Sequence, residues 1–304
     1  MSEFQDKVVI VTGAGGGIGR EHALEFGRRG AKVLVNDLGS DVRGEGEGGS
    51  RFADSVVEEI RERGGVAIAN YDSVAEPESA KAIVQSALDE FGTVDILVNN
   101  AGILRNRTFK KTSVEDFQLV VQVHLLGTAF VSHAAWPVMY ENNYGRIVLT
   151  TSVSGIFGQF GQSAYGAAKM GMLGLMNVLA LEGRAHGIRV NCLSPGADTR
   201  MTALDEEHGI DPDNPRPASH PRLVTPVALH LASEDAPTGV VMHGLSGRYL
   251  RSEVFANQGV NLSDQGTYEG LVKNLDQVMD SHRLYHFESL AILRFWAIKI
   301  NTYE

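Results

Sequence analysis

Cysteine is almost absent from this sequence, because Cys192 is the only one among 304 residues. No disulfide can form within the chain, and a reducing, cytoplasmic setting is expected. Apolar runs of eighteen or more residues are also missing, since the nearest approach, residues 289–300, is interrupted by Arg294 and Lys299. The first seventeen residues lack the charged start and long apolar stretch of a signal peptide. These absences predict a chain without a membrane span.

Positive charge is scarce as well, with 27 Lys and Arg against 37 Asp and Glu and a formal net charge of −10. Such a balance argues against nucleic acid or an anionic membrane surface as the main partner. No spacing of histidine, cysteine or acidic residues is typical of a metal site, so no metal is expected. The partner class that this leaves is a small-molecule substrate.

Short apolar runs alternate with helical patterns along the first two hundred residues. Six of these runs predict buried strands, at residues 7–12, 31–37, 66–72, 94–102, 145–152 and 188–196. Nearly continuous apolar strands separated by helices are typical of a parallel sheet covered on both faces. The sequence therefore predicts a Rossmann-type α/β fold, a doubly wound parallel sheet in three layers.

The pattern weakens after Pro195. Residues 197–222 are polar and rich in proline, which predicts a substrate flap, and residues 239–259 contain one further strand. We expect one nucleotide-binding domain over residues 1–262 and a helical tail over 263–304. The aromatic, amphipathic tail either packs on its own subunit or contacts a neighbouring subunit, and the sequence leaves both open.

A glycine-rich loop, "TGAGGGIGR", directly follows the first strand and opens the first helix. Gly13 permits a tight turn, Gly17 permits close approach of the backbone, and Gly19 lets the helix pack on the strand. The helix then presents free N–H groups and its positive end to a pyrophosphate. This context predicts a dinucleotide site, with Gly16 and Ile18 as further candidates for contact with the cofactor.

An acidic residue, Asp37, ends the second strand eighteen positions after Gly19. A carboxylate there accepts both ribose hydroxyls of NAD and repels the 2′-phosphate of NADP. Arg43 lies in the loop beyond and not beside it. The alternative is that Asp37 merely ends a strand. The expected cofactor is NAD.

Three polar residues follow one another in "TTSVSGIFGQFGQSAYGAAK": Ser152, Tyr165 and Lys169. Tyr165 and Lys169 are spaced i and i+4, so they share one face of a helix. A nearby ammonium favours the phenolate and lowers the tyrosine pKa from its ordinary value of about 10. Ser152 follows the fifth strand at the ligand-binding edge and would hold a substrate oxygen. The alternative is an ordinary amphipathic helix with a polar side.

With these motifs, the chain resembles the short-chain dehydrogenase/reductase family over roughly residues 5–260. The resemblance rests on "TGAGGGIG", "NNAG", Ser152, Tyr165 to Lys169 and "PG". It implies that Tyr165 is the general base for alcohol oxidation and that Lys169 binds the nicotinamide ribose. It implies a dimer or tetramer. It also implies further cofactor contacts at Asp72, Ser73, Asn99, Ala101, Gly102, Pro195, Gly196 and Thr199.

One departure from that family concerns a proton relay. The family places an asparagine in the long fourth helix, whereas this sequence has His124 in "VHLLG". Imidazole also binds water and passes protons, so we expect His124 to belong to the catalytic set. The alternative is a histidine that only fills a helix face. His124 in "VHLLG", together with "VNDLGSDVRGEGEGGS" and "TRMT", makes the chain resemble one branch of that family. This branch is the (3R)-hydroxyacyl-CoA dehydrogenase domain of multifunctional β-oxidation enzymes.

The resemblance implies an NAD-dependent dehydrogenase acting on a secondary alcohol, a (3R)-hydroxyacyl-CoA in lipid or steroid side-chain breakdown. A cationic cluster, Arg105, Arg107, Lys110 and Lys111, either meets the phosphates of CoA or is a solvated loop. Two other functions stay open. One is oxidation of free hydroxysteroids, and the other is a non-catalytic NAD-binding protein.

Overall fold

The computed structural model describes residues 3–46, 49–204, 210–211, 213–262, 266–282 and 284–286. Its contacts divide the chain into two compact units, Met1–Arg251 and Ser252–Glu304. The boundary predicted at residue 262 stays a prediction. Residues 287–304 of the predicted helical tail lie outside the described residues, as do 205–209 and 212 of the predicted flap.

A single eight-stranded sheet is the centre of the first unit, and its strand order is β3-β2-β1-β4-β5-β6-β7-β8. All neighbouring pairs from β3 to β7 are parallel. The strands are β1 (Val8–Thr12), β2 (Lys32–Asn36), β3 (Val66–Asn70), β4 (Ile96–Asn99), β5 (Gly145–Thr150), β6 (Ile188–Gly196), β7 (Val241–Leu245) and β8 (Arg248–Ser252).

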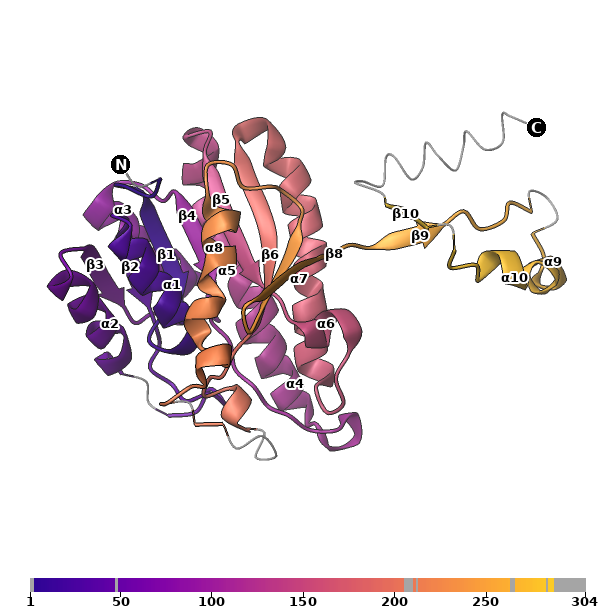
Figure 1. Ribbon diagram of the computed structural model, residues 1–304, viewed down its shortest axis with the longest axis horizontal. Helices are drawn as coiled ribbons and strands as arrows, with labels where there is room; N and C mark the ends of the chain where they lie inside the picture. Colours follow the sequence, from indigo (N-terminus) through magenta and orange to yellow (C-terminus); the bar gives the residue numbers. More distant parts are fainter. Residues whose placement is uncertain are drawn as a thin grey trace. The chain divides into compact units, whose positions relative to one another are not determined.

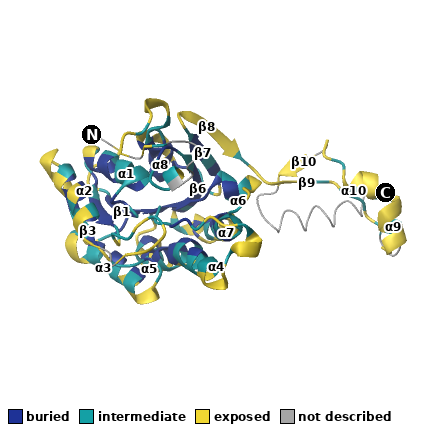
Figure 2. Cartoon of the chain, turned by 90° about the horizontal axis from the view of Figure 1, so that it is seen from below, coloured by how far each residue is buried: buried dark blue, intermediate teal, exposed yellow. Residues whose placement is uncertain are grey.

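Helices cover both faces of this sheet (Figure 1). On one face lie α1 (Gly17–Arg28), α2 (Arg51–Glu62) and α8 (Thr225–Ala232). On the other lie α3 (Pro77–Phe91), α5 (Gly127–Glu141) and α7 (Ser163–Glu182). Side chains alternate across β1, so Val9 packs into the first core and Ile10 into the second. Figure 2 shows the buried residues along the sheet between the two layers, which confirms the predicted doubly wound fold.

The strand order reverses between β1 and β4, whose chains leave the sheet toward opposite sides. In open α/β sheets such a reversal opens a crevice at the carboxyl ends of the strands. The glycine loop follows β1 at this edge, and residues 100–104 follow β4 there. The fold therefore places the two segments beside each other.

The opposite edge of the sheet is closed by a buried cation. Arg146, at the start of β5, is 2% exposed. Its guanidinium donates hydrogen bonds of 2.8–3.2 Å to the backbone carbonyls of Gly145, Gly187, Ser233 and Glu234. One side chain thus supplies donors to the carbonyl oxygens of several connections, among them the buried oxygens of Gly145 and Ser233.

One long helical stretch runs from α4 (Val114–Val121) through a π-helical turn (Gln122–Leu126) into α5, which contains Pro137 and ends at Glu141. One expectation about elements needs correction. One strand was expected over 239–259, but the first unit ends in the pair β7 and β8. Their turn, Ser246 and Gly247, has positive φ at both positions, as a tight hairpin requires.

Shorter elements complete the described part of the chain. Beside α6 (Val153–Phe157) there are 3-10 turns at Phe109–Lys111, Arg184–His186, Thr202–Leu204, Pro217–Ser219 and Pro221–Leu223. The second unit contains α9 (Tyr268–Lys273), α10 (Leu275–Val278) and the antiparallel pair β9 (Phe255–Asn257) and β10 (Leu284–His286).

Two helical stretches of the described chain, Val114–Glu141 and Ser163–Glu182, are long and apolar enough to cross a membrane by length and composition. Both carry residues of the core beneath the sheet, among them Val131 and Met172. Apolar helices that build a core meet the same criterion.

Candidate active site

The glycine loop adopts a backbone that requires glycine at two positions. Gly13 has φ of +63° and Gly17 has φ of +54°. A Cβ on Gly13 would lie 2.7 Å from the Cα of Ala101, so the loop passes directly against the segment after β4. A Cβ on Gly19 would overlap the carbonyl oxygen of Gly13. The loop is therefore a close-packed turn from which α1 starts.

A pair of polar side chains holds this loop to the segment after β4. The Asn100 amide donates to the carbonyls of Thr12 (3.1 Å) and Gly13 (3.0 Å). In return, the Thr12 hydroxyl accepts from the backbone N–H groups of Asn100 (3.0 Å) and Ala101 (3.1 Å). The predicted Asn99 lies on the other face of the strand, where its amide donates to Ser132 Oγ at 3.0 Å.

Asp37 directly follows β2 and lies beside the loop. One carboxylate oxygen accepts the N–H of Gly15 and the other accepts the N–H of Gly39, both at 2.8 Å. A Cβ on Gly15 would lie 2.8 Å from Oδ2 of Asp37 and 2.6 Å from Cβ of Phe52. Two backbone donors and close packing thus fix the orientation of this carboxylate.

A cavity of about 420 Å³ runs along this edge of the sheet. Most of the predicted site residues line it: Gly13, Gly16, Gly17, Ile18, Asp37, Asp72, Ser73, Ala101, Gly102, His124, Tyr165, Lys169, Pro195 and Thr199. Four predicted residues do not, namely Gly19, Asn99, Ser152 and Gly196. Gly19 and Gly196 are packing positions, because a Cβ on either would collide with Gly13 or Leu245.

Two of the three predicted polar residues, Tyr165 and Lys169, line the cavity from α7. Ser152 lies close enough to the Tyr165 hydroxyl to act on the pKa of that group. Ser152 also caps α6, where its Oγ accepts the N–H of Ser154 at 3.1 Å. The Lys169 ammonium donates to the carbonyl of Thr150 at 2.6 Å and lies 5.6 Å from the centre of the Tyr165 ring.

The pKa values of this pair differ from the simple expectation. Burial raises the pKa of Tyr165, and the hydrogen bond from Ser152 only partly opposes the shift. Burial also lowers the pKa of Lys169 from 10.5 to about 7. The expectation that the ammonium lowers the tyrosine pKa is therefore wrong for the protein without a bound cofactor. The reason is that a desolvated lysine gives up much of its own charge near neutral pH.

His124 contacts the tyrosine from the π-helical turn. The two rings meet edge to face, with centres 5.1 Å apart and planes at 88°. His124 Nε2 lies 3.1 Å from the N–H of Ile103 and 2.7 Å from its carbonyl oxygen, while the buried Nδ1 has no partner within the described chain. Burial, followed by the charge of Lys169, holds the His124 pKa well below 6.5. His124 is thus a neutral ring against the tyrosine.

The cationic cluster is divided in the structure. Arg105 forms an ion pair with Asp116 at 2.5 Å and donates to the carbonyl of Arg43 at 2.9 Å. Arg107, Lys110 and Lys111 are exposed on the surface after β4. Arg105 already has an anionic partner, and the other three are accessible to a solvent-borne anion.

Sequence reasoning missed several residues of the cavity wall. Asn100 and Arg200 are polar, whereas Val74, Leu119 and Val123 are apolar. Asn100 stands within the quoted "NNAG", and Arg200 within "TRMT", so both motifs were visible although these members were not selected. The apolar residues carry no local signal, because any helix or strand face supplies such side chains.

Comparison with known proteins agrees with this geometry. The model of the short chain dehydrogenase family matches residues 7–209. The chain therefore belongs to the short-chain dehydrogenase/reductase family of enzymes.

Two relatives show what this chain is similar to. A Mycobacterium tuberculosis protein named as a short-chain type dehydrogenase/reductase is 46% identical over 281 residues, which cover 92% of this chain and 96% of that protein. Peroxisomal multifunctional enzyme type 2 of Mus musculus is 51% identical over 231 residues, 76% of this chain but 30% of that enzyme. The chain thus corresponds to about a third of the mouse protein.

Two solved structures resemble the fold closely. The full-length peroxisomal multifunctional enzyme type 2 from Drosophila melanogaster superposes with a TM-score of 0.78 and 34% identity over 97% of this chain and 49% of that one. A short chain dehydrogenase from Mycobacterium avium gives 0.78 and 35% identity over 93% of this chain and 99% of that one.

Proposed function

We propose that this protein is an NAD-dependent dehydrogenase that oxidises a secondary alcohol to a ketone. The observation that carries the proposal is that Tyr165, with Ser152 beside it, lines the same cavity as the glycine loop. A general acid–base group and a dinucleotide cradle in one cavity are the two parts that hydride-transfer chemistry requires.

The residues present fit a dinucleotide. Gly13 and Gly17 have backbone conformations that side chains disfavour, and α1 begins at this loop with no acidic residue in its first turn to occupy its positive end. Asp37 is fixed at the end of β2 by two backbone donors, which leaves its remaining lone pairs for ribose hydroxyls. A carboxylate at this position supports NAD over NADP.

The chain's own residues then perform the proton chemistry. Ser152 holds the substrate oxygen, and Tyr165 exchanges a proton with it. A bound nicotinamide supplies the hydride acceptor. Because burial raises the Tyr165 pKa, the phenol stays protonated near neutral pH, which is the form that donates a proton in ketone reduction. Oxidation needs the phenolate and therefore gains from higher pH.

For the substrate we propose a (3R)-hydroxyacyl-CoA. The similarity to peroxisomal multifunctional enzyme type 2 supports this choice. Exposed apolar side chains also lie next to the segment that carries the exposed cations. Phe157 and Phe160 are 71% and 90% exposed, and the backbone N–H of Arg107 donates to the carbonyl of Gly161 at 2.9 Å. Apolar rings suited to an acyl chain thus lie on a segment joined to the one that carries the exposed cations.

The test is to follow NADH formation by purified protein with (3R)- and (3S)-hydroxyacyl-CoAs of several chain lengths and with hydroxysteroids such as a 17β-alcohol. Preference for (3R)-thioesters supports the proposal, whereas turnover of free steroids alone overturns the substrate assignment. Tyr165→Phe should lower kcat by at least about 100-fold, as removal of a general acid–base group does. Full turnover by that variant would refute the mechanism, and NADH binding without any turnover by the wild type would favour a non-catalytic protein.

A further inference from the structure

An arginine from the segment after β6 lies against the start of α1. The Cζ atom of Arg200 would be 3.3 Å from a Cβ built on Gly16, which is the N-cap residue of that helix. The guanidinium also lies over the ring of Phe52, 4.8 Å from its centre. Arg200 and Gly16 both line the cavity. The guanidinium therefore stands over the glycine loop.

This placement is electrostatically unusual. The start of a helix carries the positive end of its dipole and favours anions, whereas cations favour the other end. The first turn of α1 contains no acidic residue. Within the residues that the structure describes, no carboxylate forms an ion pair with Arg200 at this site. A cation and a helix start that face each other both become more stable when an anion lies between them.

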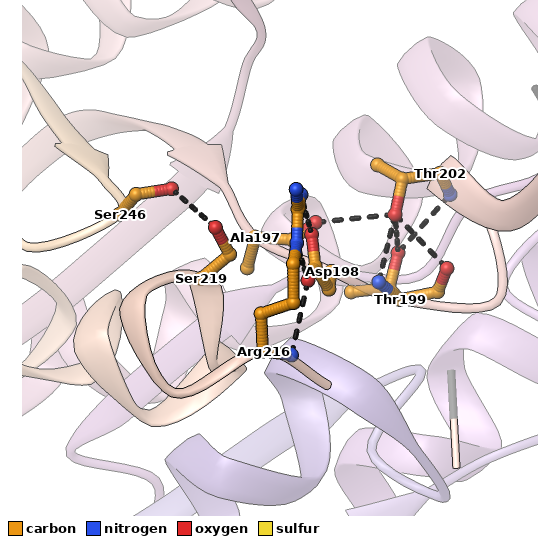
Figure 3. A network of polar contacts seen from close by, with 7 residues as sticks. All are labelled: Ala197, Asp198, Thr199, Thr202, Arg216, Ser219 and Ser246. Carbon is orange, nitrogen blue, oxygen red and sulfur yellow. Dashed lines mark hydrogen bonds and ion pairs between the residues drawn. The ribbon is translucent and has the colours of Figure 1, made fainter. Parts of the chain in front are cut away.

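A compact turn holds the arginine in place. The hydroxyl of Thr202 accepts the N–H of Thr199 at 2.7 Å and donates to the carbonyl of Ala197 or Thr199, at 3.2 and 2.9 Å (Figure 3). The methyl group of Thr199 faces the loop, 3.5 Å from a Cβ built on Gly17. Thr199 and Arg200 therefore lie over neighbouring residues of the loop.

The base of the same segment is fixed by a forked ion pair (Figure 3). Nε and one terminal nitrogen of Arg216 each donate to a different oxygen of Asp198 at 2.8 Å, and the backbone N–H of Arg216 adds a third bond at 3.1 Å. The Asp198 N–H donates to the carbonyl of Ser219 at 2.8 Å. Asp198 is 3% exposed, whereas the Arg216 side chain is 64% exposed, so the buried carboxylate is held by an arginine that reaches it from the surface.

We propose that Arg200 is a cofactor-binding residue whose guanidinium donates to the diphosphate of the dinucleotide, opposite the N–H groups of the glycine loop. The planar fork of arginine suits phosphate oxygens. Asp198 and Arg216 are positioning residues that keep the turn bearing Arg200 over the loop. The inference rests on the proposed function, because it needs a dinucleotide in this cavity.

The experiment is a binding titration with NADH, NADPH, ADP and AMP on Arg200→Met, Arg200→Lys and the control Arg184→Met. Arg184 is an exposed arginine in the turn after α7 and does not line the cavity. Loss of charged hydrogen bonds should raise the Kd of NADH and ADP about 10- to 100-fold in Arg200→Met, with a smaller rise in Arg200→Lys and none in the control. AMP, which lacks the diphosphate, should lose less affinity than ADP.

Three outcomes separate the failures. If wild-type protein binds none of these nucleotides, the proposed function falls and the inference with it. If the wild type and Arg200→Met bind NADH equally well, only the inference falls. This holds even if Arg200→Met changes the affinity for NADPH or the KM of a thioester. If the Kd for ADP and AMP rises equally, the diphosphate contact is refuted.

The positioning role has its own readout. Asp198→Asn should raise the NADH Kd when Arg200 is present but add little in the Arg200→Met background, because the two changes act through one contact. An equal rise in both backgrounds would overturn the positioning role. Thermal unfolding of each variant, recorded without nucleotide, identifies any general loss of fold.

Discussion

Lys169 is expected to reduce the stability of the fold that carries it. The residue is 3% exposed, and its ammonium has one hydrogen-bond partner in the described chain, the carbonyl of Thr150. Burial lowers its pKa from 10.5 to about 7. Between these two values the unfolded chain binds more protons than the folded one, so the free energy of unfolding rises with pH across this window. Below pH 7 the penalty is complete.

The magnitude follows from the size of the shift. At pH 7 the displaced titration costs the folded state about 4 kcal/mol, and at pH 9 it costs about 2 kcal/mol. Lys169→Met removes the titrating group while keeping a side chain of similar length, but it leaves the Thr150 carbonyl without its donor, a loss of about 1–3 kcal/mol. The variant should therefore be about 1–3 kcal/mol more stable than wild type at pH 7.

Urea unfolding without nucleotide, followed by tryptophan fluorescence at pH 7 and pH 9, measures this difference. The advantage of Lys169→Met over wild type should shrink by about 2 kcal/mol between the two pH values, while the variant loses dehydrogenase activity. The control is Lys81→Met, whose ammonium is 62% exposed beside Glu78 and should give a difference independent of pH. A Lys169→Met variant whose stability difference does not change with pH would refute the reasoning.

Three further predictions concern the same molecule. Because burial raises the Tyr165 pKa, kcat/KM for alcohol oxidation should rise steadily from pH 6 to 10 while that for ketone reduction falls at the alkaline end, and steady-state rates in both directions check this. Because the His124 pKa is held well below 6.5, His124→Ala should lower kcat without removing any inflection between pH 6 and 8, and an inflection lost from the rate profile would contradict a neutral ring. Arg146→Leu removes four hydrogen bonds, two of them to the buried carbonyls of Gly145 and Ser233, and should lower the free energy of unfolding by about 3 kcal/mol, which chemical denaturation measures; an unchanged midpoint would show that these oxygens find other donors.

The fold was predictable because its strands are buried on both faces. Runs such as "KVVIVT" and "VDILVNN" have no polar side that could turn to water, so a central parallel sheet is the arrangement that satisfies them. The cavity followed from topology, since the residues after β1, β2, β4, β5 and β6 reach one edge of that sheet. The split of residues 239–259 into more than one strand was also visible in principle, as "SG" supplies a two-residue turn.

Other features depend on contacts that no local pattern encodes. The π-helical turn that carries His124 lies where that ring packs against Gly102, at a position where a Cβ would overlap the imidazole. Asn99 ends β4 and pairs with Leu149 of β5, whereas Asn100 follows the strand and lines the cavity. The sequence alone does not show at which of these two asparagines the strand ends. The pKa directions of Tyr165 and Lys169 follow from exclusion of water, which spacing along a helix does not report. The expected dimer or tetramer and the cytoplasmic location stay predictions, and sedimentation of the purified protein addresses the first.

The buried guanidinium of Arg146 has a consequence for how this molecule tolerates change. It ties together the connections at the edge of the sheet remote from the cavity, whereas the cavity edge keeps buried polar atoms without partners in the described chain, such as Nδ1 of His124 and Oγ1 of Thr150. The groups proposed for catalysis and the hydrogen bonds of Arg146 thus lie at opposite ends of the same strands. Residues around the cavity can be exchanged for a new substrate while the remote end keeps the fold intact.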